Sequence, residues 1–453
     1  MSNETKISPA FEPFLAHSRP NDKRDAIVIY HAPPPEGPRV RGRIRALRQR
    51  LKAAEEHAAA QRVVQEKLFE DYRKASSKAL PGKQQLAVSS IGENKMPVAN
   101  VEVTPKTLPA LAEQPNVVAI LPNQRIHLIK PKEVDYARLQ SQENRDGLTW
   151  GLKQLGIPEL WKNTKGKDIN VGVLDTGVHG EHPALAGRVK DFVVIDPLGR
   201  RITTNDSATF DADQHGTHVC GTIAGGKTDG GVAIGVAPEA NLLVAGVLVG
   251  NATLRTLFEG LSWAVEKGAD IISMSLGFSY YEPLFANVFD MLTEQYGILP
   301  VAAIGNENYG NSSSPGNAVS ALSVGAVEKV GPGVEVAFFS SGASLVFPDA
   351  ASINLVTKPD VVAPGVQVYS CIPPTERPDD KYTFAYFDGT SMATPHVAGV
   401  AALLMAARPE AQVADIVKAL KDTAKHPAGK EQRPDNRWGY GLIQPAKALH
   451  ALG

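Results

Sequence analysis

Short apolar runs alternate with amphipathic segments from about position 150 to the end of the chain. Runs rich in β-branched residues occur at 169–175, 270–277 and 301–304, and each ends at a glycine or polar turn. Two further segments, 254–267 and 413–423, have the apolar spacing of helices. Alternating strands and helices are typical of a parallel sheet with helices on both faces. We therefore expect an α/β fold, and about 300 residues suffice for one such domain with a large core.

The first 149 residues have a different pattern. A long helical stretch covers 40–72, where apolar residues three and four positions apart form one stripe, and a shorter helix is expected at 108–114. Strand-like runs occur at 23–30, 85–89, 98–103 and 117–121. This order predicts a small α+β module with its helices on one face of a sheet.

These patterns divide the chain into four parts. We expect a flexible N-terminus at 1–22, the α+β module at 23–129, a linker at 130–149 and the α/β domain at 150–453. The linker assignment rests on the polar and charged residues that follow position 129. The sequence ends soon after the last α/β motif, so we expect no accessory domain there.

The beginning of the long helix is strongly basic. Seven lysine and arginine residues occur in the 14 positions from 39 to 52. Such a cluster is found in nucleic-acid-binding proteins, but aromatic residues are not interleaved with it, and the net charge of the whole chain is −1. We favour a solvated helix face, balanced by acidic residues later in the same helix, and expect no nucleic-acid partner. A docking site for a regulatory partner is the alternative.

Composition also bears on where the protein acts. Residues 1–25 are polar and interrupted by prolines, and they lack the apolar core of a signal peptide. The longest apolar run, 397–407, is too short to span a membrane, so no membrane association is expected. Two cysteines argue against a disulfide framework. These features predict a cytoplasmic protein.

Ser391 is the strongest candidate for a catalytic group. It lies between a Gly-Thr turn and the apolar run 397–407, which we interpret as a buried helix that tolerates Pro395 in its first turn. Unpaired N–H groups and the macrodipole at a helix N-terminus favour developing negative charge, which suits a nucleophile that generates an oxyanion. A capped core helix without chemistry is the alternative for this string alone.

Two further candidates lie upstream of the serine. Asp175 ends a predicted parallel strand, at the edge where open α/β sheets gather functional groups, and His215 begins a small-residue helix. Asp175-Thr-Gly could also belong to an aspartic protease, but that chemistry needs two carboxylates and no second Asp-Thr-Gly exists. His215 and His218 have metal-ligand spacing, yet no His or Cys cluster completes a zinc site. We expect His218 and His396 to be structural.

Two more segments carry candidate binding groups. Asn306 follows the predicted strand at 301–304 in a Gly-Asn turn, where asparagine is often only a turn former. Ser275, Leu276 and Gly277 end the strand at 270–277, and glycine there would let another backbone approach closely. A plain core strand is the alternative for these three residues.

Taken in order, these strings resemble the subtilisin-like serine proteases, or subtilases. Further matching strings are Gly235-Val-Ala-Pro238, Lys358-Pro-Asp-Val-Val-Ala-Pro-Gly365 and Gly439-Tyr-Gly-Leu. The resemblance implies that Asp175 orients His215, that His215 takes the proton of Ser391, and that Ser391 attacks the peptide carbonyl. It also implies that Asn306 and the Ser391 N–H donate to the oxyanion, and that Ser275, Leu276 and Gly277 flank the bound peptide. A catalytically silent peptide-binding protein is the rival hypothesis.

Residues 108–121 resemble part of the inhibitory propeptide of subtilases, a weaker match than that of the α/β domain. The resemblance implies a zymogen whose N-terminal module inhibits the enzyme, and a self-cleavage that leaves a fragment beginning between positions 128 and 147. Cleavage after Lys130 is disfavoured because Pro131 follows it. A module that docks a regulatory partner remains the alternative.

The sequence departs from the family at one metal position. Many subtilases have an aspartate in a His-Pro-Asp-Leu string that helps to bind a structural calcium, and here the string is His182-Pro183-Ala184-Leu185. Since Ca²⁺ takes six to eight oxygen ligands, losing a carboxylate argues against this site. We therefore doubt a structural calcium at this position, and we expect that catalysis requires no cofactor.

Overall fold

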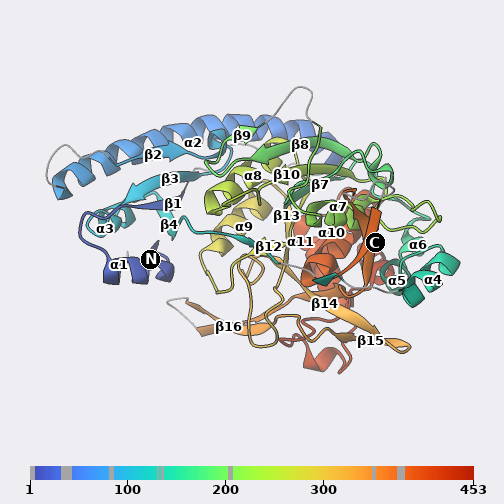
Figure 1. Ribbon diagram of the computed structural model, residues 1–453. Helices are drawn as coiled ribbons and strands as arrows, with labels where there is room; N and C mark the ends of the chain where they lie inside the picture. The colour runs from blue at the N-terminus through green and yellow to red at the C-terminus, as the bar shows by residue number, and fades with distance from the viewer. Residues whose placement is uncertain are drawn as a thin grey trace.

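The computed structural model describes residues 6–31, 43–80, 86–129, 132–133, 137–202, 208–348, 353–374 and 383–453. The N-terminal module, here residues 6–129, lies against an α/β body formed by residues 137–453 (Figure 1).

A large twisted sheet forms the centre of the body. Its strand order is β15-β14-β13-β11-β7-β10-β8-β9, and β18 also pairs with β14. Every neighbouring pair is parallel except the hairpins β14–β15 and β8–β9. The expected parallel sheet is confirmed. The strands are β7 (Asn170–Asp175), β8 (Val189–Ile195), β9 (Arg201–Ile202), β10 (Asn241–Gly246), β11 (Ile271–Met274), β13 (Leu299–Ala303), β14 (Leu322–Val330), β15 (Gly333–Val336) and β18 (Val361–Pro364).

Helices cover both faces of this sheet. One apolar cluster joins one face to α7 (His215–Ala224), α10 (Thr390–Ala407) and α11 (Val413–Thr423). Another joins the opposite face to α8 (Leu254–Glu266) and α9 (Phe285–Glu294). By length and composition α10 is a candidate membrane span, but 89% of it is buried inside the body, as expected for a core helix. Smaller helices are α5 (Trp150–Gln154), α6 (Ile157–Leu160) and α12 (Pro445–Ala451).

The N-terminal module is built on a four-stranded antiparallel sheet of order β2-β3-β1-β4. Its strands are β1 (Arg24–Tyr30), β2 (Val88–Ser90), β3 (Val98–Val103) and β4 (Val117–Pro122). Its main helices are α2 (Arg43–Ala79) and α3 (Leu108–Ala112), and a short turn of helix, η3 (Gly92–Asn94), precedes β3. The predicted elements are confirmed with small shifts at their ends, except that α2 continues to Ala79.

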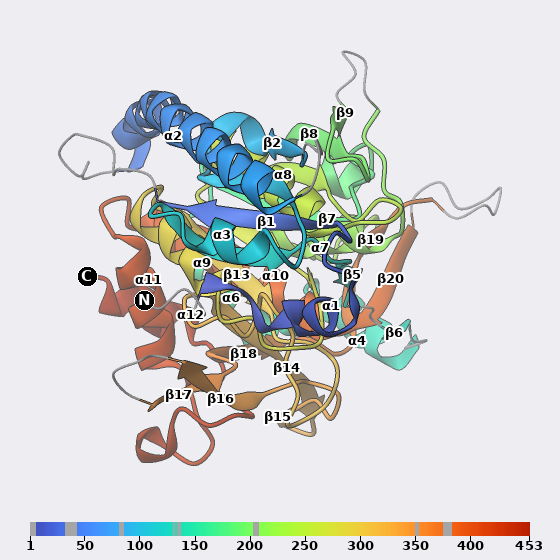
Figure 2. The same cartoon turned by 90° about the vertical axis from the view of Figure 1, so that its left-hand side faces the viewer.

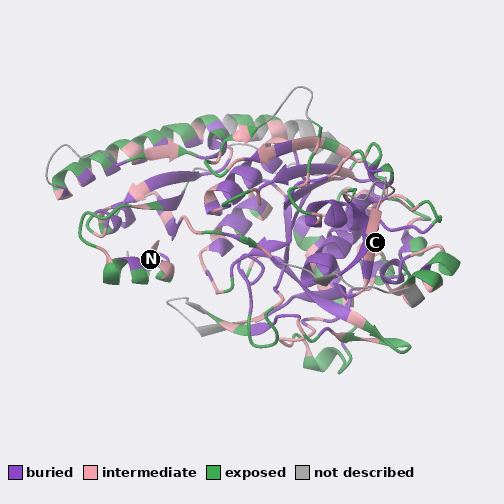
Figure 3. Ribbon diagram, in the orientation of Figure 1, coloured by how far each residue is buried: buried purple, intermediate pink, exposed green. Residues whose placement is uncertain are grey.

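Both faces of the module sheet are buried, for two different reasons. Because side chains alternate along a strand, Val28 and Tyr30 of β1 point to one face and Ile27 and Ile29 to the other. Val28 and Tyr30 pack with residues of α2 and α3, whereas Ile27 and Ile29 pack with residues of α8 and α9. In Figure 2, α2 lies above β1 and α9 lies below the strand. In the part of α2 whose side chains are described, the side turned away from the module sheet is exposed (Figure 3).

Three segments differ from the sequence predictions. The predicted flexible N-terminus at 1–22 instead contains η2 (Pro9–Phe11) and α1 (Glu12–His17), and Phe11 and Phe14 are buried, with the Arg24 guanidinium over both rings. Two aromatic side chains supply enough apolar surface to dock this short segment. Residues 1–5 lie outside the described residues.

The predicted linker at 130–149 also contains structure. It includes β6 (Lys132–Glu133) and α4 (Ala137–Asp146), a polar helix whose Glu143 is buried. The Glu143 carboxylate accepts hydrogen bonds from the Trp150 N–H and the Tyr386 hydroxyl. This helix is anchored by polar contacts, so an apolar periodicity could not reveal it.

Two strands at 343–348 and 353–358 have no counterpart among the elements predicted from the sequence. Strands β16 (Ala343–Pro348) and β17 (Ile353–Lys358) pair with each other in an antiparallel register. They form a separate two-stranded sheet.

Candidate active site

The fold brings three predicted residues together at one edge of the sheet. Asp175 is the last residue of β7, His215 is the first residue of α7, and Ser391 is the second residue of α10. All three are fully buried in the assembled chain. The His215 Nδ1 atom lies 2.7 Å from Asp175 Oδ1. A short ion pair of this kind fixes the orientation of the imidazole ring.

The electrostatics of His215 are set by two opposing effects. Burial alone lowers the pKa of this histidine, but the Asp175 charge and hydrogen bond outweigh burial, so the pKa is raised. Because Nδ1 donates to the carboxylate, the neutral ring has its lone pair on Nε2. That Nε2 has no hydrogen-bond partner among the described residues. The ring is therefore arranged to accept a proton at Nε2.

The Ser391 hydroxyl contacts the chain's own N-terminal module. Its Oγ donates a hydrogen bond of 2.9 Å to the carbonyl oxygen of Ile129. Helix α10 begins at Thr390, so Pro395 is its sixth residue and not part of the first turn, which corrects the sequence prediction. Pro395 has no N–H to offer the Ser391 carbonyl, and Ser275 Oγ donates to that carbonyl instead, at 3.1 Å.

Asn306 is oriented by the residue before the serine. Its Oδ1 accepts hydrogen bonds from the Thr390 N–H and the Thr390 hydroxyl, both at 2.9 Å. These contacts identify Nδ2 as the donating end of the amide. A Cβ built on Gly389 would lie 3.3 Å from that Nδ2, so the donor is held beside the loop that leads into α10.

The three predicted substrate-binding residues line a strand that is already paired. β12 (Leu276–Gly277) forms an antiparallel ladder with β5 (His127–Leu128), and the Ile129 N–H points to the Ser275 carbonyl at 3.5 Å. A Cβ on Gly277 would lie 2.2 Å from the Ser314 carbonyl oxygen, which explains the glycine. The partner strand comes from the end of the module.

The chain enters a second strand pairing after Ile129. β6 pairs with β20 (Thr383–Asp388), which joins β19 (Val368–Ile372) in a small antiparallel sheet. Residues 127–128 pair with β12 and residues 132–133 pair with β20, and the Ile129 carbonyl between these two segments accepts the Ser391 hydroxyl. The sequence did not identify Ile129 or β20 as parts of the site, because strand register depends on tertiary pairing.

The other histidines near the site are held neutral. His218 stacks on Phe387 at 4.4 Å, and its Nε2 lies within 3.2 Å of two backbone carbonyl oxygens. Burial lowers the pKa of His218 to about 3 and that of His396 to about 4. In the part of the chain that the structure describes, no group of three or more His, Cys, Asp or Glu side chains is placed to hold a metal ion.

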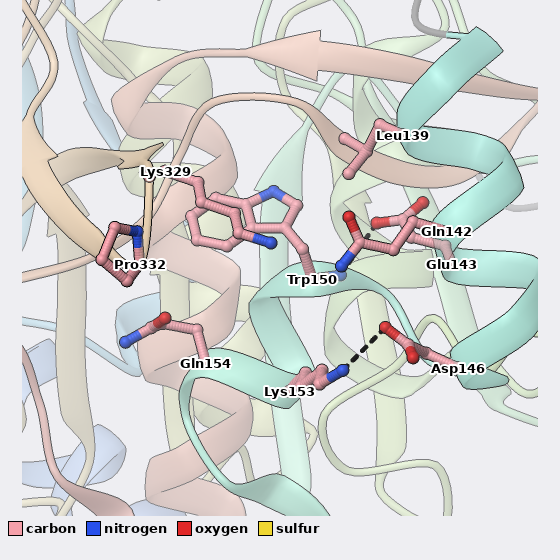
Figure 4. Close-up of a pocket in the computed structure, with 10 residues that line it drawn as sticks. Leu139, Gln142, Glu143, Asp146, Trp150, Lys153, Gln154, Lys329 and Pro332 are labelled. Carbon is pink, nitrogen blue, oxygen red and sulfur yellow. Dashed lines mark hydrogen bonds and ion pairs between the residues drawn. The ribbon is translucent and has the colours of Figure 1, made fainter.

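A pocket of about 350 Å³ lies beside α4 and α5, away from the three residues of the site (Figure 4). Lys153 and Asp146 form an ion pair at its rim. Burial raises the pKa of Glu143 to about 7 in its wall. The pocket is lined by Leu139, Gln142, Glu143, Asp146, Trp150, Lys153, Gln154, Lys329, Gly331 and Pro332.

Comparisons with known proteins identify the family of this chain. The profile of the subtilase family, peptidase S8, matches residues 166–441. An intracellular serine protease of Paenibacillus polymyxa is 34% identical over 293 residues, covering 62% of this chain and 78% of the relative. The M-protease of Shouchella clausii is 31% identical over 356 residues, covering 78% of this chain and 79% of the relative. The chain belongs to the subtilase family.

A solved structure supports the same assignment. The crystal structure of fervidolysin from Fervidobacterium pennivorans, described as a keratinolytic enzyme related to subtilisin, superimposes with a TM-score of 0.67 at 25% identity. The match covers 96% of this chain and 62% of the fervidolysin chain, so this chain spans less than two thirds of that protein. The chain is thus a subtilisin-like serine protease, and its substrates are proteins or peptides.

The comparisons correct the predicted cytoplasmic location. The relatives include secreted proteases, among them the M-protease, an alkaline protease and fervidolysin, as well as intracellular serine proteases. The prediction rested on the polar residues 1–25, which do not establish where the protein acts. The cytoplasmic prediction is therefore wrong.

Proposed function

We propose that the protein is an endopeptidase that works through Asp175, His215 and Ser391, with Asn306 as an oxyanion donor. The support is geometric, because a buried Asp–His pair, a serine in the first turn of a helix and an oriented amide share one edge of the sheet. In this mechanism His215 Nε2 removes the proton of Ser391 Oγ as the oxygen attacks the peptide carbonyl. Asp175 stabilises the imidazolium that forms, and His215 then protonates the leaving amine. Water next attacks the acyl group on Ser391 as His215 removes its proton, and that proton returns to Ser391 Oγ when the ester breaks.

Negative charge develops on the carbonyl oxygen during this attack. In the proposed mechanism the Asn306 Nδ2 and the Ser391 backbone N–H donate to that oxygen, since both lie at the start of α10. The helix N-terminus adds a favourable partial positive charge. We infer that Ser275, Leu276 and Gly277 align the substrate as an added antiparallel strand, because β12 already pairs in this way with β5.

The contribution of Asn306 can be measured separately from binding. We expect Asn306→Ala to lower kcat by about 10²–10³-fold, as found for the oxyanion asparagine of subtilisin, while KM changes little. The variant should still react, more slowly, with a fluorophosphonate probe that labels Ser391. If the protein were a catalytically silent peptide-binding protein, the wild-type chain would not react with the probe. An unchanged kcat in Asn306→Ala would show that the Asn306 amide does not donate to the oxyanion.

We further propose that the protein is made as a zymogen and cuts its own chain between Ile129 and Lys130. The observation that supports this most directly is the 2.9 Å hydrogen bond from Ser391 Oγ to the Ile129 carbonyl. The chain that leads to this carbonyl lies in the substrate position, paired with β12. Residues 130 and 131 lie outside the described residues, but the presence of Pro131 independently disfavours a cut one bond later.

The pairing of β5 with β12, together with further polar contacts between the module and the body, suggests that the N-terminal module inhibits the enzyme until the module is removed. The backbone N–H of Gly92 donates to Glu259 at 2.9 Å, and Ser262 Oγ donates to the Gly92 carbonyl at 2.8 Å. Tyr296 donates its hydroxyl proton to the Lys95 carbonyl. These polar contacts surround the apolar interface with α8 and α9. The alternative of a regulatory partner at the basic stretch 39–52 gains no support, since most of those side chains lie outside the described residues.

Calcium dependence provides a test of the altered metal position. Ala184 replaces the family carboxylate, so we expect EDTA to change the melting temperature little. The measurement is a thermal melt of the processed enzyme in EDTA, with and without added Ca²⁺. A large loss of stability that Ca²⁺ alone restores would reveal a calcium site in this chain.

A further inference from the structure

A second acidic side chain, Asp211, is built into the active-site edge beside Asp175. It lies in the loop before α7, and its two carboxylate oxygens accept hydrogen bonds from four donors. The donors are the Thr176 hydroxyl (2.6 Å), the Thr217 N–H (2.7 Å), the Thr217 hydroxyl (2.6 Å) and the Asp213 N–H (3.1 Å). An acceptor that faces donors only is suited to an ionised carboxylate.

These contacts tie together the two elements that hold Asp175 and His215. Thr176 directly follows Asp175, and its N–H donates to Asp175 Oδ1 at 2.7 Å. The Thr176 hydroxyl donates to Asp211 and accepts from the Gly216 N–H at 2.9 Å. Asp211 thus connects the end of β7 to the first turn of α7 through one hydroxyl.

The end of β7 and the start of α7 approach each other so closely that little displacement between them is possible. A Cβ on Gly216 would lie 2.1 Å from the Gly177 carbonyl oxygen, so the backbones after Asp175 and His215 are in direct contact. Gly177 and Asp211 also form an isolated antiparallel bridge. A small shift of the loop at Asp211 would therefore move the imidazole relative to Asp175.

The negative charge of Asp211 also favours the protonated form of His215. Burial is the largest influence on His215 and lowers its pKa, whereas Asp175, Asp211 and Asp213 all raise it. Burial raises the pKa of Asp211 itself, its hydrogen bonds oppose this, and the Asp175 charge adds to the rise. Other titratable groups near α7 include His182, His218 and His396, whose pKa values are lowered by burial, and the buried thiols Cys220 and Cys371, whose pKa values are raised by burial. His179 also lies beside this helix, where its backbone N–H donates to the Thr217 hydroxyl.

We propose that Asp211 is a positioning residue for catalysis, which holds the Asp175–His215 pair in register and adds a second negative charge behind the imidazole. This inference rests on the proposed triad. Nothing in the local sequence distinguished Asp211 from Asp213, because both are acidic residues of one polar loop and only the fold surrounds the carboxylate of the first with four hydrogen-bond donors.

The test compares Asp211→Asn with Asp213→Asn. Both variants remove one negative charge from the same loop. The Asp213 side chain is exposed, and Asp213 contacts Asp211 through its backbone N–H, which the substitution leaves in place. In Asp211→Asn an NH₂ group replaces one acceptor and faces a donor. We expect kcat to fall roughly ten- to hundredfold with KM nearly unchanged, since misplacement of a catalytic group acts on the reacting geometry.

The pH profile distinguishes this role from a purely structural one. Neutral His215 is the active form, so kcat/KM falls as the pH decreases through the His215 pKa. Loss of the Asp211 charge lowers that pKa, and the acid limb of Asp211→Asn should move to lower pH. Asp213→Asn should move it less, because solvent screens an exposed charge. An acid limb that stays at the wild-type position, or that moves equally in both variants, would overturn the proposal.

A second measurement does not depend on activity. In the full-length Ser391→Ala background, NMR titration of the His215 imidazole reports its pKa with and without Asp211→Asn. If Asp211→Asn fails to fold, Thr176→Val removes the connecting hydroxyl at similar volume, and a wild-type kcat in that variant would overturn the proposal. Failure of the triad would instead appear as hydrolysis that persists in Ser391→Ala.

Discussion

Replacement of Ser391 by alanine should leave the chain at full length and lower peptide hydrolysis on the order of a millionfold, the loss found when the subtilisin nucleophile is removed. The same change should abolish labelling by a fluorophosphonate probe. Both effects are expected together because one hydroxyl is proposed to cut the substrate and the chain's own linker. The measurements are an activity assay, intact mass and N-terminal sequencing of purified protein.

The wild-type chain should yield a fragment whose first residue is Lys130. The structure narrows the range predicted from sequence to one bond, since the Ile129 carbonyl is the one that accepts from Ser391 Oγ. Ser77→Ala is a suitable control, because this exposed serine of α2 bonds only within its own helix. A fully active wild-type enzyme that never cleaves here would contradict the zymogen hypothesis, and the module would then be better explained as a regulatory domain.

Substitution of Gly92 by alanine should weaken binding of the cleaved module by roughly 30- to 1000-fold, which corresponds to about 2–4 kcal/mol. Gly92 has a φ of +61°, and a Cβ there would lie 1.7 Å from Ser262 Oγ and 2.0 Å from Ser262 Cβ. The contact with α8 must therefore open, and the hydrogen bonds to Glu259 and Ser262 are lost with it. Faster appearance of activity and loss of the fragment on gel filtration are the expected results.

Gly187→Ala is the matched control for this change. Gly187 has a φ of +70° and no atom within 4 Å of a built Cβ, so the variant carries the same backbone strain without the clash. It should retain the module as the wild-type chain does. If Gly92→Ala also retains the module and shows wild-type inhibition, the contact with α8 does not hold the inhibitor in place.

Much of the α/β body could be predicted because its signals are local. The strand that ends at Asp175 and the helix 413–423 follow from apolar runs and periodicity, and the structure places β7 and α11 there. The polar helix α4 was missed, since its buried Glu143 is stabilised by hydrogen bonds that no apolar pattern encodes. The hairpin β16–β17 was missed because its strands pair only with each other.

The residues of the candidate site also fall into two groups, those that short motifs identify and those that only tertiary contacts place. Asp175, His215, Asn306 and Ser391 stand at ends of strands and helices, where short motifs identify them. The positions of Ile129 and Asp211 depend on partners distant in sequence: Ile129 meets a serine 262 positions later, and Asp211 contacts a threonine 35 positions earlier. Pairings of this kind arise from register and loop packing, which a single sequence does not specify.

The interface of the module has a kinetic consequence. Ser8 donates to Glu282, Gln61 to Tyr296, and Gly92 to Glu259, and these contacts come from separate segments of one fragment. While one contact is open, the others keep it at a high effective concentration, so the intact fragment should leave only when all of them open together. A second cut between those segments would turn a multivalent ligand into weak monovalent pieces. Release of activity would then be governed by the rate at which the bound fragment is nicked, and a small amount of free enzyme would accelerate the activation of the rest.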